Sequence, residues 1–232
     1  MSLENIRYVV FDLNGTLVVE DYLRHDEVLE VILKCRRRGR GMTVEDLRDV
    51  SKGNRSLKEM IARLYTVDNP AAVACQFLEI QSSRIVFREK TLDILSELQG
   101  RYKLILCSDT TGIAKMVVKK LDLSRYFIKV LYSCDVGYLK SEEEFWTNLL
   151  SYFHEARSTE FLVVGDNPRA DTYHPKRLGM HTIQIKNPIQ LSLDYRERSI
   201  DSDEEKPECC IKDLEEILPL LGIKTKKRLN ET

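Results

Sequence analysis

The sequence has no long hydrophobic run and no excess of charge of either sign. A membrane-spanning helix needs about 20 consecutive apolar residues, and no stretch of the chain comes near that length. The 36 Lys and Arg residues nearly balance the 37 Asp and Glu residues, so no overall field favours nucleic acid or an acidic membrane as a partner. The first residues also lack the basic and apolar segments of a secretory signal. We therefore expect a soluble, cytoplasmic protein that binds neither nucleic acid nor membranes.

Cysteine and histidine are too scattered for a zinc site or a disulfide framework. Zinc sites use closely spaced Cys and His ligands, and disulfides belong to oxidising compartments. The four histidines have no partner at ligand spacing, and no C-x-x-C pair occurs. We therefore expect free thiols in a reducing compartment and no metal binding through nitrogen or sulfur. The six cysteines are at positions 35, 75, 107, 134, 209 and 210.

A short apolar run near the N-terminus, residues 6–11, ends in Asp12. Such a run is typical of a strand that is buried on both faces of a parallel sheet. Asn14 and Gly15 follow as turn residues, and a glycine lets backbone amides approach a ligand. Asp12 is then expected at the C-terminal end of the strand, where open α/β sheets bind ligands. The simpler alternative is an Asx turn in which Asp12 only caps the strand.

From residue 90 onward, helical patterns alternate with apolar strand patterns. This alternation indicates right-handed crossovers and predicts a doubly wound α/β fold with a parallel sheet. The strand at 182–185 alternates in polarity and is expected near an edge. The predicted strands are 104–108, 128–132, 161–164 and 182–185, with a candidate at 209–211; the predicted helices are 91–98, 113–121, 142–153, 169–178 and 212–221. A charged loop is expected at 194–207 and a basic tail at 224–232.

The segment between the first strand and this alternating region has a helical pattern throughout. We expect residues 18–87 to form an all-helical domain that is inserted into a core made of residues 1–17 and 88–232. Its first helix is expected over residues 23–38, ending before glycines 39 and 41. Three further helices are expected to begin at Thr43, at Ser56 and at Asn69-Pro70, because these residues are favoured at helix N-termini.

Polar side chains suited to phosphate chemistry follow four of the predicted strands. The carboxyl ends of parallel strands meet at one edge of a sheet, so these side chains are expected to converge. They are Asp12, Ser108, Lys140, Asp166 and Asp171. A cluster of carboxylates with few histidines favours Mg²⁺.

This set of residues, in this order, resembles the haloacid dehalogenase superfamily of phosphotransferases. The resemblance rests on Asp12-Leu13-Asn14-Gly15-Thr16-Leu17 and on the segment from Gly165 to Asp171, and it covers residues 6 to about 185. The helical insertion resembles the C1 cap of subfamily I phosphatases. The resemblance implies a Mg²⁺-dependent phosphatase of a small phosphorylated metabolite. Carbon–halogen hydrolysis is disfavoured, because the paired Asp166 and Asp171 suit a metal and a phosphate.

The resemblance also implies a role for each site residue. Asp12 is the expected nucleophile, which forms an aspartyl-phosphate. Mg²⁺ would be held by Asp12, the backbone carbonyl of Asn14 and Asp166, with Asp171 completing or orienting the site. Ser108 would bind a phosphoryl oxygen, and Lys140 would offset negative charge. The neighbouring residues 109 and 110 are weaker candidates.

Asn14 departs from the family pattern, which has a second aspartate at this position to protonate the leaving group. An amide cannot donate and recover a proton at neutral pH. A cap residue such as Glu20, Asp21 or His25 could replace it, or the leaving group could need no proton. Alternatively, the protein keeps phosphate and Mg²⁺ binding as a sensor or interaction module. A further hypothesis is deamidation at Asn14-Gly15, which would create an aspartate.

Two other features leave alternatives open. His174 lies close to the metal side and is either a proton carrier or a packing residue. The basic run Arg36–Arg40 is either a solvated helix end or, through Arg40 between two glycines, a grip on a second anionic group of the substrate. The identity of the metabolite and the oligomeric state do not follow from the sequence.

Overall fold

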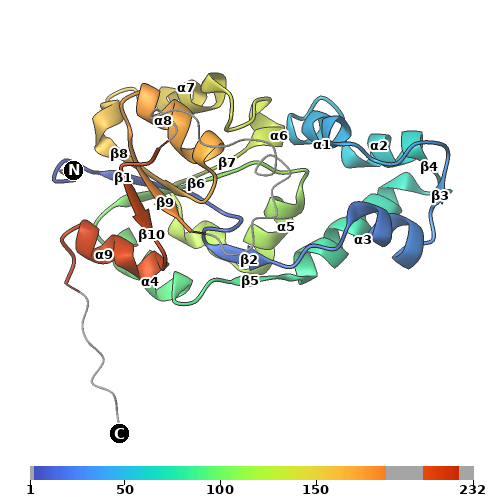
Figure 1. Cartoon of the computed structure of the whole chain (residues 1–232), viewed down its shortest axis with the longest axis horizontal. Coiled ribbons are helices and arrows are strands. Elements are labelled where there is room, and N and C mark those ends of the chain that lie inside the picture. The colour runs from blue at the N-terminus through green and yellow to red at the C-terminus, as the bar shows by residue number, and fades with distance from the viewer. Residues whose placement is uncertain (1–2, 187–205, 225–232) are drawn as a thin grey trace, which may run out of the picture.

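The computed structural model describes residues 3–186 and 206–224, and within these ranges six strands form one parallel sheet (Figure 1). The order of the strands is β10-β9-β8-β1-β6-β7. Most of the charged loop expected at 194–207 and nearly all of the tail expected at 224–232 lie outside the described residues. The strands are β1 (Tyr8–Asp12), β6 (Lys103–Ser108), β7 (Lys129–Tyr132), β8 (Phe161–Gly165), β9 (His181–Ile185) and β10 (Cys209–Ile211).

Strand β1 is central because apolar side chains cover both of its faces. All five of its residues are buried. Val9 and Phe11 belong to one hydrophobic cluster, and Tyr8 and Val10 belong to a second cluster on the other face. Helices α4 (Thr91–Gln99), α5 (Ile113–Lys120) and α9 (Ile217–Leu220) contribute to the first cluster, and α7 (Glu143–Ser151) contributes to the second. Figure 1 shows α7 and α8 (His174–Arg177) on the opposite side of the sheet from α4 and α9.

The predicted alternation of strands and helices is confirmed, with a few local differences. The strand expected near an edge, β9, is second from the edge because the candidate strand β10 pairs with it. The helix expected at 169–178 begins as the π-helix η4 (Pro168–Tyr173) and continues as α8. The last helix begins as a 3₁₀ turn, η7 (Leu214–Glu216). Further short elements are α6 (Ser133–Val136), η2 (Leu123–Tyr126) and η3 (Ser158–Glu160).

The insertion leaves and re-enters the core through a short antiparallel ribbon. Its strands are β2 (Val18–Glu20) and β5 (Ile85–Phe87), in which Val18 pairs with Phe87. Beyond the ribbon lie α1 (Val44–Ser51), α2 (Leu57–Leu64) and α3 (Pro70–Ser83). The three predicted helix starts are confirmed, because the side chains of Thr43, Ser56 and Asn69 each accept a bond from a backbone amide of the first turn.

The expectation of an all-helical insertion without strands is wrong. The helix expected over residues 23–38 is limited to the π-helix η1 (Glu27–Ile32). Lys34 has φ +53, a left-handed conformation that ends the helix, and the chain continues as β3 (Arg36–Arg37), paired with β4 (Tyr65–Thr66). Strands of two or three residues are too short to show an alternating pattern in the sequence.

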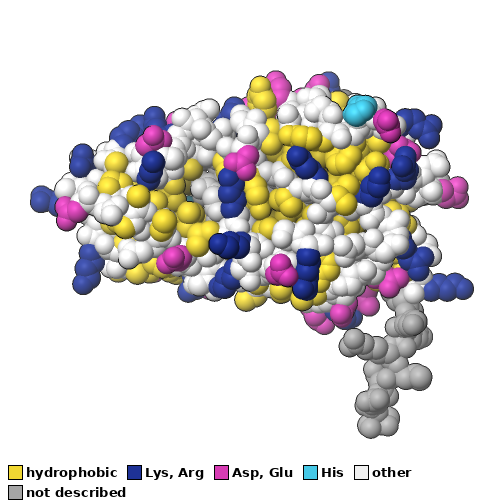
Figure 2. All heavy atoms as spheres, turned by 180° about the vertical axis from the view of Figure 1, so that it is seen from behind, with side chains coloured by type: hydrophobic (Ala, Val, Ile, Leu, Met, Phe, Trp, Pro, Cys, Tyr) yellow, Lys and Arg dark blue, Asp and Glu magenta, His cyan; other side chains and the backbone are white. Residues whose placement is uncertain are grey.

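The insertion also contacts the core directly. Lys52 Nζ lies 2.7 Å from Glu142 Oε1, and a side chain on Gly53 would overlap the backbone oxygen of Cys134. Helix α3 packs against α5 through Leu78, which lies close to Gly112. Figure 2 shows positive and negative side chains spread among one another on the rear face. In the described ranges, no helix is both long and apolar enough to cross a membrane.

Candidate active site

Asp12 is the last residue of β1 and so lies at the C-terminal edge of the sheet. Asp12 is 6% exposed, and the hydroxyl of Thr16 donates to its Oδ2 at 3.2 Å. Gly15 has φ +74, a conformation that favours glycine, and its amide donates to the carbonyl of Val18 at 2.9 Å. The turn therefore folds back on itself and holds the hydroxyl of Thr16 against the carboxylate.

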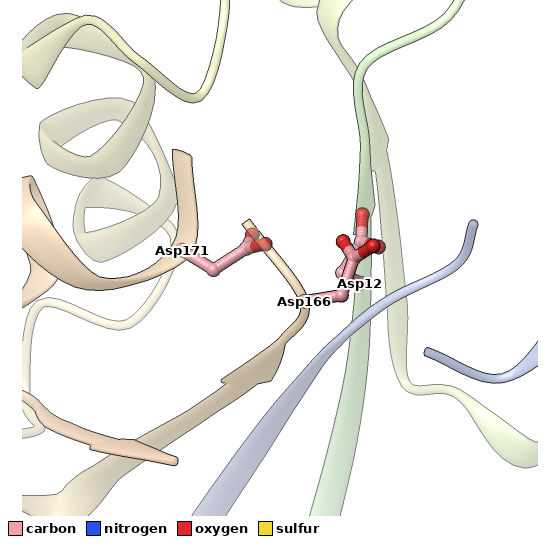
Figure 3. A group of neighbouring side chains, drawn as sticks. All are labelled: Asp12, Asp166 and Asp171. Atoms are coloured by element: carbon pink, nitrogen blue, oxygen red, sulfur yellow. The ribbon is translucent and has the colours of Figure 1, made fainter. Parts of the chain in front are cut away.

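Three carboxylates meet at this edge. Asp12, Asp166 and Asp171 each offer an oxygen atom, and these atoms all lie within 4.8 Å of one another. Asp166 follows β8, the neighbour of β1, and Figure 3 shows Asp171 pointing from its own segment towards the other two. The amide of Asn167 donates to Asp171 Oδ2 at 3.1 Å. A Cβ on Gly165 would overlap the side chain of Asp171, so glycine is required for this approach.

Lys140 lies between two of these carboxylates. It is 3% exposed, and its ammonium donates to Asp12 Oδ1 and, at 2.7 Å, to Asp171 Oδ1. Its backbone is fixed on both sides: the amide donates to Asp109 Oδ1 at 2.9 Å, and the carbonyl accepts from the indole of Trp146 at 2.7 Å. These two anchors bring the ammonium of Lys140 into the cluster.

Burial and mutual repulsion control the charges of the site. Burial raises the pKa of Asp12. The ammonium of Lys140 lowers this pKa, whereas the carboxylates of Asp171 and Asp166 raise it further. Burial alone would lower the pKa of Lys140, but Asp12 and Asp171 raise it well above its usual value, so this ammonium stays charged. The single ammonium of Lys140 contacts two carboxylates, those of Asp12 and Asp171, which leaves an excess of negative charge around it. The oxygen donors and this excess fit a hard divalent cation such as Mg²⁺.

Asn14 lies in the loop after Asp12, but no bond fixes its amide oxygen. Its Oδ1 is buried and has no hydrogen-bond partner among the described residues. Deamidation requires the backbone nitrogen of Gly15 to attack the side chain of Asn14. The N–H of Gly15 instead donates a hydrogen bond to the carbonyl of Val18. The turn therefore works against the deamidation hypothesis. The role of the Asn14 carbonyl as a metal ligand stays a prediction.

Ser108 lies at the end of β6, next to β1, and is 1% exposed. Among the described residues, the hydrogen bond of its hydroxyl is a long one of 3.4 Å to the carbonyl of Asp109, so the hydroxyl remains able to donate to a ligand. Thr110 is different: its hydroxyl accepts from the amides of Gly112 and Ala114 at the start of α5. Thr110 therefore supports a helix, and Asp109 positions Lys140.

The residues considered as substitutes for the missing acid have other contacts. Asp21 is exposed and pairs with Arg84. The ring of His25 lies 5.4 Å from that of Phe77, and burial lowers the pKa of His25. The side chain of Glu20 lies outside the described part of the structure. None of these contacts joins a described candidate to the carboxylate cluster.

His174 and Arg40 each contact the protein. His174 Nε2 lies 2.9 Å from the carbonyl of Ser141, which ties α8 to the segment that carries Lys140. Arg40 pairs with Asp46 inside the insertion, and its grip on a substrate stays a prediction. The helix end proposed for residues 36–40 is wrong, because this run contains β3.

The sequence patterns do not predict the residues that hold the candidate site residues in place. Trp146 is one of them; it is the only tryptophan in the sequence and lies six residues after Lys140. Arg88 was also missed; its guanidinium donates to the carbonyl of Gly15 at 2.5 Å. Arginine is common in the sequence, and no local pattern distinguishes this one.

Comparisons with known proteins agree with this architecture. The model of the haloacid dehalogenase-like hydrolase family matches residues 6–173. No curated protein sequence matches the chain.

Solved structures similar to the chain include three haloacid dehalogenase-type proteins. The magnesium-bound hydrolase YfnB from Bacillus subtilis has a TM-score of 0.61 at 16% identity, over 94% of this chain and 99% of that one. The 2-haloacid dehalogenase from Pseudomonas syringae has 0.63 at 19%, over 94% and 98%. The Bacteroides thetaiotaomicron enzyme Bt-2542, in complex with magnesium and inorganic phosphate, has 0.61 at 20%, over 83% and 100%. At such identities the likeness shows a shared fold.

Proposed function

The chain belongs to the haloacid dehalogenase-like hydrolases, and on that premise we propose that it is a Mg²⁺-dependent phosphatase of a small phosphorylated metabolite. The observation that carries the proposal is the contact of Lys140 with Asp12 and Asp171, beside a third carboxylate at the same sheet edge. A similar fold holds magnesium and inorganic phosphate in the Bacteroides enzyme. Another similar fold belongs to a 2-haloacid dehalogenase, but three clustered carboxylates suit a divalent cation, and a bound cation favours a phosphate as the substrate group.

The metal would be held by Asp12, Asp166 and Asp171, with the backbone carbonyl of Asn14 as a further oxygen ligand. When bound, Mg²⁺ neutralises the carboxylates and orients the phosphate. Lys140 supplies a permanent positive charge beside the nucleophile, because its carboxylate neighbours keep it protonated. The hydroxyl of Ser108 is available to donate to a phosphoryl oxygen.

Hydrolysis takes place in two steps. A carboxylate oxygen of Asp12 attacks phosphorus, the bond from phosphorus to the ester oxygen breaks, and its electrons leave with that oxygen. Water then attacks the phosphorus of the aspartyl-phosphate, which releases inorganic phosphate and restores the carboxylate of Asp12. The leaving oxygen of an alkyl ester needs a proton in the first step, and Asn14 cannot supply it.

Asn14 also favours a second candidate function, that of a sensor which binds phosphate and Mg²⁺ with little turnover. Loss of general acid and base assistance typically costs about 10²–10⁴ in rate. Substrates with a good leaving group avoid most of this loss. The two functions are therefore distinguished by how turnover depends on the leaving group.

The test compares p-nitrophenyl phosphate with an alkyl phosphate in the presence of Mg²⁺. We expect turnover of the aryl ester, its abolition by Asp12→Asn, and faster hydrolysis of the alkyl ester after Asn14→Asp. Asp93→Asn, a change at an exposed carboxylate on α4, serves as a control outside the metal cluster. The absence of turnover on both esters, with binding of beryllofluoride intact, would overturn the phosphatase proposal and support the sensor.

A further inference from the structure

Arg88 is the first residue after β5, where the chain returns from the insertion into the core. Its guanidinium donates to the carbonyl of Gly15 at 2.5 Å, and its backbone amide donates to the carbonyl of Leu17 at 3.0 Å. The hydroxyl of Thr91 donates to the same Leu17 carbonyl at 2.9 Å. The residues that follow the ribbon therefore hold the loop that follows the nucleophile.

The guanidinium is buried more deeply than a surface arginine. Its Nε is buried and has no hydrogen-bond partner among the described residues. Burial lowers the pKa of Arg88, and the carboxylates of Asp166 and Asp213 act in the opposite direction. Burying a guanidinium costs solvation free energy. The hydrogen bond to the carbonyl of Gly15 offsets only part of this cost, because Nε stays without a partner among the described residues.

The bonds of the loop form a continuous path to the nucleophile. Arg88 holds the carbonyl of Gly15, which belongs to the same peptide unit as the nitrogen of Thr16. The hydroxyl of Thr16 donates to Asp12 Oδ2. Fixing the Gly15 peptide therefore fixes the side chain that orients the carboxylate.

We propose that Arg88 is a positioning residue. It ties the core-side end of the ribbon of β2 and β5 to the loop that follows the nucleophile, and it so sets the orientation of Asp12. The proposal rests on Asp12 being the nucleophile. Val18 and Phe87 are the last pair of the ribbon on the core side, so Arg88 is the first residue beyond the ribbon. A displacement of the ribbon would be transmitted to the Gly15 carbonyl through this side chain.

Arg84 provides a matched control. It lies at the insertion end of the same ribbon, and its Nε donates to the backbone carbonyl of Asp21 at 2.6 Å. Arg84→Ala removes an arginine–carbonyl hydrogen bond of the same kind, together with the exposed ion pair to Asp21, and it leaves the hydrogen bonds of the nucleophile loop in place.

The kinetic test compares Arg88→Ala with Arg84→Ala on p-nitrophenyl phosphate. A small misplacement of a reacting group costs on the order of 10²-fold in rate, so we expect kcat of Arg88→Ala to fall about 10- to 100-fold, with KM changed far less. Added guanidinium ion is expected to restore part of the activity of Arg88→Ala and none in the control. Equal kcat values for the two variants at equal folded fraction would overturn the proposal.

Hydrogen exchange tests the same idea without turnover. The amides of Gly15 and Leu17 donate to the carbonyls of Val18 and Leu13 within the loop. We expect Arg88→Ala to speed exchange at both amides, and Arg84→Ala to leave them unchanged. Unchanged exchange in Arg88→Ala would overturn the positioning role. If the unaltered protein lacks turnover, the phosphatase proposal fails, and exchange still decides the role of Arg88.

Discussion

The core and the insertion each contain a buried carboxylate that is bonded to basic side chains, but the two clusters have opposite charge balance. In the insertion, Asp46 is 3% exposed and is bonded to Arg40 and Arg63, which gives one carboxylate to two guanidinium groups. In the core, Asp12 and Asp171 share the ammonium of Lys140, and Asp166 lies beside them.

The partners also differ in their contact with solvent. The side chains of Arg40 and Arg63 are 52% and 43% exposed, so water solvates their remaining charge. The side chain of Lys140 is 4% exposed, and that of Asp171 is 3% exposed. A structural cluster therefore compensates its buried charge with solvated partners. In the core, two buried carboxylates, Asp12 and Asp171, contact one buried ammonium, and this charge imbalance away from water indicates a binding site.

Replacing Lys140 by Met should give the largest effect, because it removes the cation from the core cluster. We expect turnover of p-nitrophenyl phosphate to fall about 10²–10³-fold, the usual cost of losing a charged stabilising group. Without Mg²⁺, the free energy of unfolding should fall by roughly 3–5 kcal/mol, as when one partner of a buried ion pair is removed. Urea unfolding and steady-state kinetics measure both effects.

Mg²⁺ should restore part of the stability that Lys140→Met removes, because the bound cation, like the ammonium of Lys140, reduces the repulsion among the carboxylates of the cluster. A stability loss that Mg²⁺ does not reduce would contradict this account of the cluster. Lys52→Met is the matched control, since Lys52 pairs with Glu142 at 2.7 Å outside the carboxylate cluster.

Mg²⁺ alone should stabilise the unaltered protein through the core cluster. A ligand at 100 times its Kd adds about 2.7 kcal/mol to the free energy of unfolding. For a chain of this size, we expect Tm to rise by roughly 5–10 °C. Calorimetry with Mg²⁺ and with EDTA measures the shift, and Asp166→Asn should reduce it. Asp46→Asn should leave the shift intact; an equal reduction in both variants would show that the two clusters do not differ as proposed.

Gly165→Ala should separate the clusters through shape rather than charge. The added Cβ overlaps the side chain of Asp171, so this carboxylate must move away from Asp12. We expect turnover to fall about 10-fold or more, as for other small displacements in active sites, with weaker Mg²⁺ binding. Gly39→Ala is the control in the insertion, because no atom of the described residues lies within 4 Å of its Cβ position. Unchanged kinetics in Gly165→Ala would mean that Asp171 is not needed at its present place.

The core cluster was accessible from the sequence, whereas the cluster of the insertion was not. Asp12, Lys140, Asp166 and Asp171 follow strands of a parallel sheet, and parallel strands bring their carboxyl ends together. The topology alone therefore predicts that these residues converge. Strand β1 was also identifiable, because a parallel strand buried on both faces is a continuous apolar run in the sequence.

The insertion lacks such a rule. The sequence predicted that α1 begins at Thr43, and Asp46 lies in the first turn of this helix. The pairing of Asp46 with Arg63, however, depends on how α1 and α2 pack. The contact between Arg88 and Gly15 likewise joins residues that are 73 positions apart. These contacts depend on tertiary packing, and no local pattern in the sequence predicts them.

Replacing Asp46 by Asn should have the smallest effect on activity and a distinct effect on stability. Hydrogen bonds from Arg40, and further bonds from Thr43, hold the pKa of Asp46 well below its usual range. A carboxylate with a lowered pKa adds stability above its unfolded pKa of about 3.9, and this stability is lost as the pH falls through the folded pKa. The substitution should therefore cost about 1–2 kcal/mol at pH 7, and progressively less below pH ~4.

Urea unfolding at pH 7 and at pH 3 measures this dependence on Asp46. Asp49→Asn is the control on the same helix, because Asp49 is more exposed and lies 3.9 Å from Arg55. Turnover in both variants should stay close to that of the unaltered protein, since the cluster of Asp46 is already compensated without a ligand. A cost of Asp46→Asn that is the same at both pH values would locate the loss in packing rather than in charge. The contrast between the two clusters would then rest on the core cluster alone.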